Sequence, residues 1–184
     1  GNIDFDAVVG TTRLGNVSIT NANNVTADAA FSATTISQTA GGGTTTFSNT
    51  VNTNGAGGID LNGNQFTFSN TVTTTGGGPV AVTNTGLLTI AGAANMSLDG
   101  SFTQNTGLVS MAGDITTTGD TINFNGNVTL TGAVDLDSTN TVPAGATITF
   151  GGTLNGTQNL TLNAGTGGNI DFDAVVGTTR LGNV

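Results

Sequence analysis

The stretch "INFNGNV", residues 122–128, decides the fold of this chain. Its apolar residues, Ile122, Phe124 and, after a bend, Val128, alternate with three asparagines. Successive side chains of a β-strand point to opposite faces, so this alternation predicts a short strand with an apolar inner face and a polar outer face. The Asn-Gly pair inside it supplies the residues that tight turns favour.

The same pattern recurs along the whole chain, loosely spelled apolar, polar, Phe or Leu, polar, small or polar, polar, apolar. Two longer matches recur at one common offset: "TFSNTV" begins at positions 46 and 67, and "NTGL(L/V)(T/S)(I/M)AG" begins at positions 84 and 105. Such spacing is typical of a repeat architecture in which each repeat makes one coil. The motif begins at Ile3, Thr45, Phe66, Met96, Ile122, Ile148 and Ile170, with a poorly marked copy near Val25.

These repeats predict an all-β fold, a parallel β-helix in which each Phe or Leu stacks on its equivalent one coil away, about 4.8 Å along the axis. Gly- and polar-rich composition also occurs in disordered chains, but 35% of the residues are hydrophobic and they fall in alternating runs. We therefore expect residues 1–184 to form one continuous β-solenoid. We expect stacked Thr and Asn on its outer face.

Composition excludes several classes of function. Gly (30), Thr (38) and Asn (23) make up about half of the 184 residues, and the net charge is −9. With two Arg and no Lys, the chain cannot neutralise a run of phosphates, which argues against nucleic-acid binding. No apolar run approaches the roughly 18 residues that a membrane-spanning helix needs. No signal segment is evident either.

A longer period overlies the short one. "GNIDFDAVVGTTRLGNV" occupies positions 1–17 and again positions 168–184, so the sequence has a 167-residue period. We expect residues 1–167 to be one full unit of a tandem array, with seven to eight coils, and residues 168–184 to start the next identical unit. Neighbouring units, stacked end to end in one chain, are then the expected partners, with lateral fibre–fibre contacts as a further option.

The text "NLTLNAGTGGNIDFDAVVGTTRLGNV" at residues 159–184, continued through the period by residues 18–26, resembles the repeats of large bacterial exoproteins. These are the filamentous-haemagglutinin-like and autotransporter-passenger families. The resemblance implies a right-handed β-helix that is secreted and displayed at the bacterial cell surface. The secretion domain and outer-membrane barrel of these families have no counterpart in this sequence, so the resemblance leaves the route of export open.

Two pairs of acids are the nearest approach to a chemical site. Asp4 and Asp6, and Asp135 and Asp137, each flank an inward apolar residue, which places both carboxylates of a pair on the outer face. Such a pair could frame a Ca²⁺ site or serve glycoside hydrolysis, but a solvated outer face explains it as well. With no His, Lys or dense acid cluster, we expect no catalytic, metal or cofactor site.

Threonine runs are the other candidate. "TTT" occurs at residues 44–46, 73–75 and 116–118, and regular T-x-T pairs on one flat face would match an ice lattice. The unequal gaps between the runs do not require a shared face. Our leading hypothesis is therefore a structural repeat of a long extracellular bacterial fibre: a stalk, matrix filament or adhesin shaft without enzymatic activity. The alternatives are a surface adhesin that binds glycan or a host receptor, an ice-binding solenoid, and a carbohydrate-active β-helix enzyme.

Overall fold

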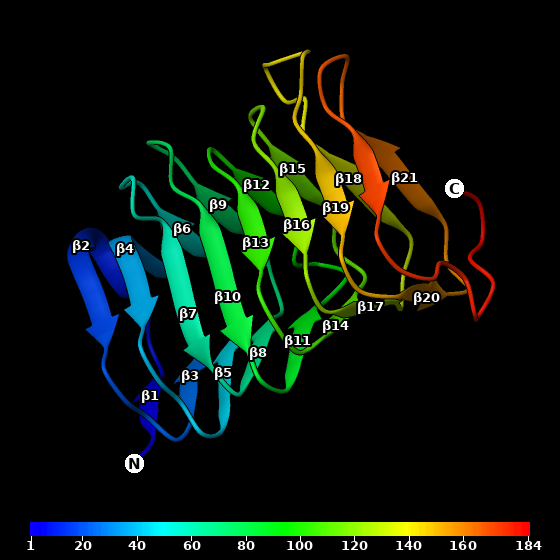
Figure 1. Ribbon diagram of the computed structural model, residues 1–184. Coiled ribbons are helices and arrows are strands. Elements are labelled where there is room, and N and C mark those ends of the chain that lie inside the picture. Colours follow the sequence, from blue (N-terminus) through cyan, green and yellow to red (C-terminus); the bar gives the residue numbers. More distant parts are fainter.

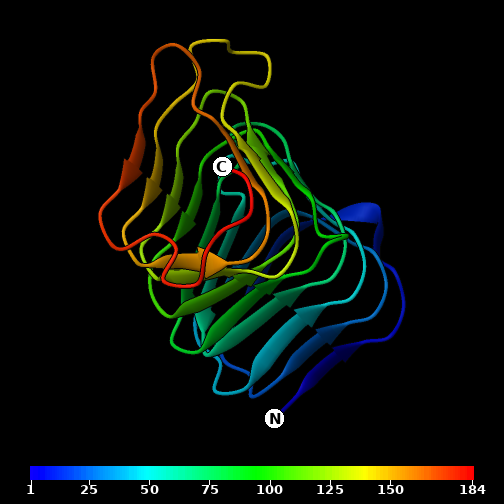
Figure 2. The ribbon, with the colours of Figure 1, turned by 90° about the vertical axis from the view of Figure 1, so that its right-hand side faces the viewer.

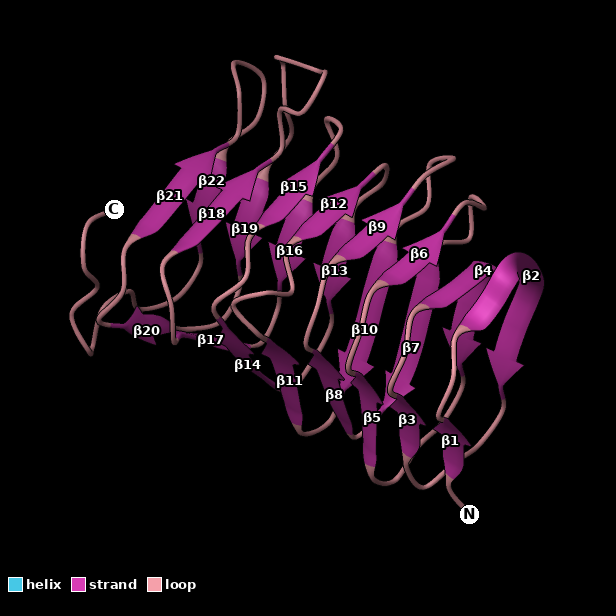
Figure 3. Cartoon of the chain, turned by 180° about the vertical axis from the view of Figure 1, so that it is seen from behind, coloured by secondary structure: helices cyan, strands magenta, loops and turns pink.

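The computed structural model describes all residues, Gly1–Val184, as 22 strands that wind into one solenoid without a helix (Figure 1). Every pairing between the named strands is parallel, and each strand pairs with strands one coil away, as in β10 between β7 and β13. In Figure 1 the strands of the near side run downward and in Figure 3, seen from behind, those of the opposite side run upward. With the chain advancing from the N- to the C-terminal end, the coil is right-handed.

Each coil has three faces, which we number in the order the chain visits them (Figure 2). Faces 2 and 3 are joined into one sheet through β4, whose first half pairs with β6 and whose second half pairs with β7. Face 1 is a separate eight-stranded sheet. It consists of β1 (Ile3–Phe5), β3 (Val25–Ala27), β5 (Thr44–Phe47), β8 (Gln65–Phe68), β11 (Leu87–Ile90), β14 (Leu108–Met111), β17 (Asn127–Leu130) and β20 (Leu154–Gly156).

The other two faces are built in the same way. Face 2 consists of the first halves of β2 (Val9–Ile19) and β4 (Phe31–Gln38), then β6 (Val51–Thr53), β9 (Val72–Thr74), β12 (Met96–Leu98), β15 (Ile115–Thr117), β18 (Val134–Asp137) and β21 (Leu160–Asn163). Face 3 consists of the second halves of β2 and β4, then β7 (Ile59–Gly63), β10 (Val80–Asn84), β13 (Phe102–Gln104), β16 (Ile122–Phe124), β19 (Ile148–Phe150) and β22 (Ile170–Phe172).

The inward positions of these strands form one continuous core. The main cluster holds 34 buried residues, and Phe66, Phe68, Phe102, Phe124 and Phe150 are at most 1% exposed. Eight of the nine phenylalanines lie in two columns of four rings each, in which three neighbouring pairs are stacked, two are edge-to-face and one is tilted. Ring pairs at these separations add to the stabilisation from burial alone. The core therefore runs through all coils.

The predicted fold is confirmed: the chain is an all-β parallel solenoid with eight complete coils, and Val176 begins a ninth by pairing with Leu154. The coils differ in length. The shortest on face 1 runs from Val109 to Val128, and the longest follows it directly, from Val128 to Leu154. This longest coil carries the long loop between β18 and β19, at residues 138–147.

The assignment of successive motifs to successive coils is wrong. Phe66 lies on face 1, Met96 on face 2 and Ile122 on face 3, so these motifs do not return to one place. From Phe66 the chain makes one complete coil to Leu88 and then steps on to the next face at Met96. All three faces accept the same apolar–polar–apolar strand, so the motif does not distinguish between them.

Candidate interaction surface

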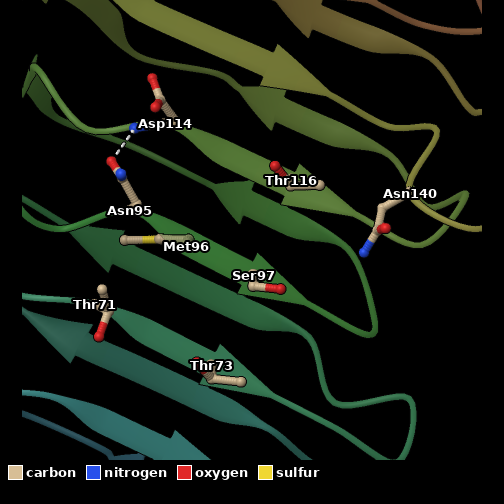
Figure 4. Close-up of a pocket in the computed structure, with 8 residues that line it drawn as sticks. All are labelled: Thr71, Thr73, Asn95, Met96, Ser97, Asp114, Thr116 and Asn140. Atoms are coloured by element: carbon tan, nitrogen blue, oxygen red, sulfur yellow. Dashed lines mark hydrogen bonds between the residues drawn. The ribbon is translucent and has the colours of Figure 1, made fainter.

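A shallow polar depression of about 430 Å³ lies on the outside of face 2 (Figure 4). Its floor comes from consecutive strands, because the outward residues Thr73, Ser97 and Thr116 of β9, β12 and β15 are in register. Along one side Asp114 donates its backbone N–H to the Asn95 side-chain oxygen at 3.0 Å. The depression is lined by Thr71, Thr73, Asn95, Met96, Ser97, Asp114, Thr116 and Asn140.

The wall at the far end of this depression comes from a different coil. Asn140 belongs to the long loop between β18 and β19, where the coil reaches its greatest length, and its side chain lies beyond the end of β15 (Figure 4). The lining offers hydroxyl, amide and carboxylate groups and a single apolar side chain. Such a surface can exchange hydrogen bonds with a polar ligand.

The predicted pair Asp135 and Asp137 lies beside this depression on β18. Burial, together with the charges of Asp114 and Asp137, raises the pKa of Asp135. Asp137 is engaged locally, because its carboxylate accepts the Thr139 backbone N–H at 2.7 Å and the Thr139 hydroxyl at 2.6 Å. No group of three or more acidic side chains in the structure could hold a metal ion.

The other predicted pair, Asp4 and Asp6, lies at the opposite end of the solenoid in the first coil, and both side chains are exposed. Asp171 and Asp173, their copies in the second 17-residue segment, are exposed in the last coil. The two predicted pairs are therefore six coils apart, and the structure does not bring them together.

The threonine runs do not form one flat array. Thr44–Thr46 lies on face 1, whereas Thr73–Thr75 and Thr116–Thr118 lie on face 2, with β12 between them. The middle residue of each run is Thr45, Thr74 or Thr117, and it points inward and is buried. The outward row across these coils of face 2 is Asn52, Thr73, Ser97, Thr116 and Asp137.

Sequence reasoning missed three buried amides near the corner between faces 3 and 1, Gln38, Asn84 and Gln104. Gln104 donates to the Asn84 side-chain oxygen at 2.9 Å and accepts the Gly126 backbone N–H at 2.9 Å, so it joins three coils. Gln38 accepts the Thr45 hydroxyl at 2.7 Å, which joins the end of face 3 to the start of the next coil. The sequence does contain a signal for them: in each of the three strands, buried and outward residues alternate, and the amide is the last buried residue.

A second missed group is Asp99, at the corner between faces 2 and 3. Its carboxylate accepts the Gly77 backbone N–H at 2.8 Å and the Thr118 hydroxyl at 3.1 Å. These hydrogen bonds stabilise the ionised form and lower its pKa. Asp99 lies between the coils of its two partners and so ties three coils together.

Arg13 is the third group that the sequence did not identify. In β2 the register shifts between Val9 and Leu14, and Arg13 at this bulge turns its guanidinium over the neighbouring coils. It donates to the backbone oxygens of Ala33 at 2.9 Å and Asn52 at 3.0 Å, and also to the Asn52 side chain. The one cation of the 167-residue period therefore ties three coils together.

Comparison of the chain with models of known protein families, with curated proteins and with solved structures gives no significant match. The structure has no helix that is long and apolar enough to cross a bilayer. The sequence and the structure together show a right-handed parallel β-solenoid with a polar depression on one face.

Proposed function

We propose that this chain is a structural repeat of a long extracellular bacterial fibre, in which identical 167-residue units stack end to end in one polypeptide. The observation that carries the proposal is the 17-residue segment present in both the first and the last coil. In the first coil the segment is covered by the next coil, through the pairing of β1 with β3 and of β2 with β4.

In the last coil the same residues are uncovered. Ile170 is 40% exposed, Phe172 39% and Val176 40%, whereas their counterparts in the first coil are half-buried. Uncovered apolar residues at a parallel strand edge favour pairing with another strand. In the first coil the residues that follow the segment, Ser18–Gln38, contain the strands that pair with this edge, β3 and β4.

A fibre of this kind acts mechanically. Backbone hydrogen bonds run from coil to coil, as in Val80 N–H to the Ser101 oxygen at 2.9 Å, and the core continues along the axis. Stability in such an array grows with each interface between neighbouring repeats. The resemblance to bacterial exoproteins supports a location at the cell surface or outside the cell. The Thr and Asn surfaces permit side-by-side packing of fibres, but the net charge of −9 keeps neighbouring fibres apart unless cations bridge them.

The mass of the native polypeptide under fully denaturing conditions tests the proposal. We expect many multiples of one unit, that is, hundreds of kilodaltons. A native chain of about 18 kDa would overturn the proposal. Negative-stain microscopy of the native material adds a direct view, in which unbranched filaments of uniform width are expected.

The depression on face 2 favours a second candidate function, a surface adhesin that binds glycan. Its hydroxyl, amide and carboxylate groups match the hydrogen-bonding groups of sugars. A glycan array probed with the wild-type chain and with Asp114→Asn and Asn140→Ala variants tests this candidate. Binding that both substitutions weaken would support it, and the absence of binding by the wild-type chain would remove it.

A further inference from the structure

The 167-residue period of the sequence does not match a whole number of coils. Ile3 lies on face 1 in the first coil, whereas Ile170, its copy, lies on face 3 in the eighth coil. The period therefore spans seven complete coils and two further faces. The two copies have the same sequence but occupy different sides of the solenoid.

The shift holds for the segment as a whole. Val9 pairs with Phe31 on face 2, whereas Val176, its copy, pairs with Leu154 on face 1. In each copy the isoleucine (Ile3 or Ile170) and the valine (Val9 or Val176) are six residues apart, and the chain moves on by one face between them. The second copy is thus the first copy advanced by two faces, which is the same as one face back.

The aromatic columns explain why this shift suits the core. The first column runs through Phe5, Phe31, Phe47 and Phe68, with ring centroids 5.2, 6.1 and 5.4 Å apart. The second runs through Phe102, Phe124, Phe150 and Phe172, at 5.1, 5.4 and 5.4 Å. The first column begins, and the second ends, on the same residue of the 167-residue period.

Phe5 and Phe172 are the same position of the period, and each copy shows one of the two rings that neighbour it inside an array. Phe5 shows the ring that covers this position, Phe31, and Phe172 shows the ring on which it rests, Phe150. When the copies are superposed, the second column of one unit continues into the first column of the next. Seven rings then contact one another in series across the junction, some stacked and some edge-to-face.

A whole number of coils would break this stack. Phe172 would have to move to face 1, where the residue below it on β20 is Gly156, and Phe150 would lose its covering ring. Gly156 offers no side chain for the ring to pack on. The observed register instead gives the phenylalanine an aromatic partner.

We propose that each unit of the array is turned by one face, about a third of a turn, relative to the unit before it. This inference rests on the proposed fibre. One unit then advances about 37 Å, and three units, or about 110 Å, bring the same face back to the same side. The face 2 depression consequently points in three directions along the fibre, so the fibre presents the same surface to neighbours on every side.

The placement of the two copies can be tested in this chain, which contains no cysteine. The structure pairs Thr149 with Asp171, and both side chains point outward. A register with whole coils would instead place Asp171 beside Asn155. We expect a short thiol-specific crosslinker to give a gel shift in Thr149→Cys/Asp171→Cys and none in Asn155→Cys/Asp171→Cys. The reverse result would overturn the inference. Circular dichroism and a thermal melt establish that both variants are folded.

Helical reconstruction of the native fibre by cryo-electron microscopy tests the array itself. We expect a repeat of about 37 Å with a rotation of about a third of a turn, and a true axial repeat of about 110 Å. A fibre whose units show no rotation would overturn this inference and leave the proposed function standing. A native chain of one unit would overturn both, and the crosslinks would still report where the two copies lie.

Discussion

The two copies of the 17-residue segment have the same sequence but not the same structure. In the first copy Arg13 makes three hydrogen bonds and Phe5 packs on Phe31, whereas in the second copy Arg180 is exposed and makes none. The difference lies in the coil that covers the first copy and is missing from the second. In a solenoid, local sequence therefore selects the strands, and the neighbouring coil determines how much they stabilise.

The largest effect is expected from the aromatic column. Phe124→Ala empties a fully buried position between Phe102 and Phe150 and is expected to cost about 3–5 kcal/mol of unfolding free energy. Phe172→Ala, at the uncovered end, is expected to cost less than about 1 kcal/mol, because its ring has a partner on one side only. Urea unfolding measures both. Equal losses would mean that coverage is not what distinguishes the two regions.

Glycine provides a comparison within the identical sequence. Gly10 and Gly177 have φ of 79° and 75°, so alanine is strained at both, by about 1 kcal/mol. Only at Gly10 would the new Cβ also collide, 2.1 Å from the Ser32 oxygen; at Gly177 the nearest atom is 3.8 Å away. We therefore expect Gly10→Ala to cost at least about 2 kcal/mol and Gly177→Ala about half of that. Thermal melts of the two variants, compared with wild type, decide. A larger loss for Gly177→Ala would contradict the placement of β2 under β4.

Arginine is the next comparison. Arg13→Ala removes a charged donor from two backbone oxygens and one amide and is expected to cost about 2 kcal/mol. Arg180→Ala is the matched control and is expected to change stability by less than about 0.5 kcal/mol. Chemical denaturation of both variants gives the values. In an array of two units the Arg180 position would be covered, so its substitution is expected to cost as much as that of Arg13.

The smallest effect is expected at two aspartates between the two copies, where the change in stability has opposite sign for the two residues and a size that depends on pH. The pKa of Asp135 is raised, so its ionisation opposes folding as pH increases, and Asp135→Asn is expected to raise the melting temperature at pH 7 but not at pH 3. The gain is expected to stay below about 1 kcal/mol, because the group is partly exposed.

Asp99 is the control of opposite sign. Its pKa is lowered, so its contribution is present above the unfolded pKa and is lost as pH falls through the folded pKa. Asp99→Asn is accordingly expected to lower the melting temperature at pH 7 and to have less effect in acid. Melts over this pH range compare both variants with wild type. A higher melting temperature for Asp99→Asn at pH 7 would be incompatible with the hydrogen bonds from Gly77 and Thr118. A lower one for Asp135→Asn would be incompatible with the raised pKa of Asp135.

The sequence by itself determined the class of fold. Alternation places Ile122 and Phe124 inward whatever their neighbours, and Gly/Asn turns divide the chain into strands. The recurrence of the same strand pattern along the chain then predicts a parallel solenoid. The inward placement of Gln104 follows from the same alternation and could have been predicted as well.

Only the tertiary structure decided which face each strand occupies and which polar residues share a surface. The step from face 1 to face 2 is shorter between Val109 and Ile115 than between Leu88 and Met96, so counting along the chain does not locate a strand on the coil. Asn140 and Thr71 are far apart in the chain and line one depression because the long loop between β18 and β19 reaches its edge. All three faces place similar apolar side chains in the core, so the strand sequence does not identify the face. The face of a strand is set by which strands of the neighbouring coils it pairs with.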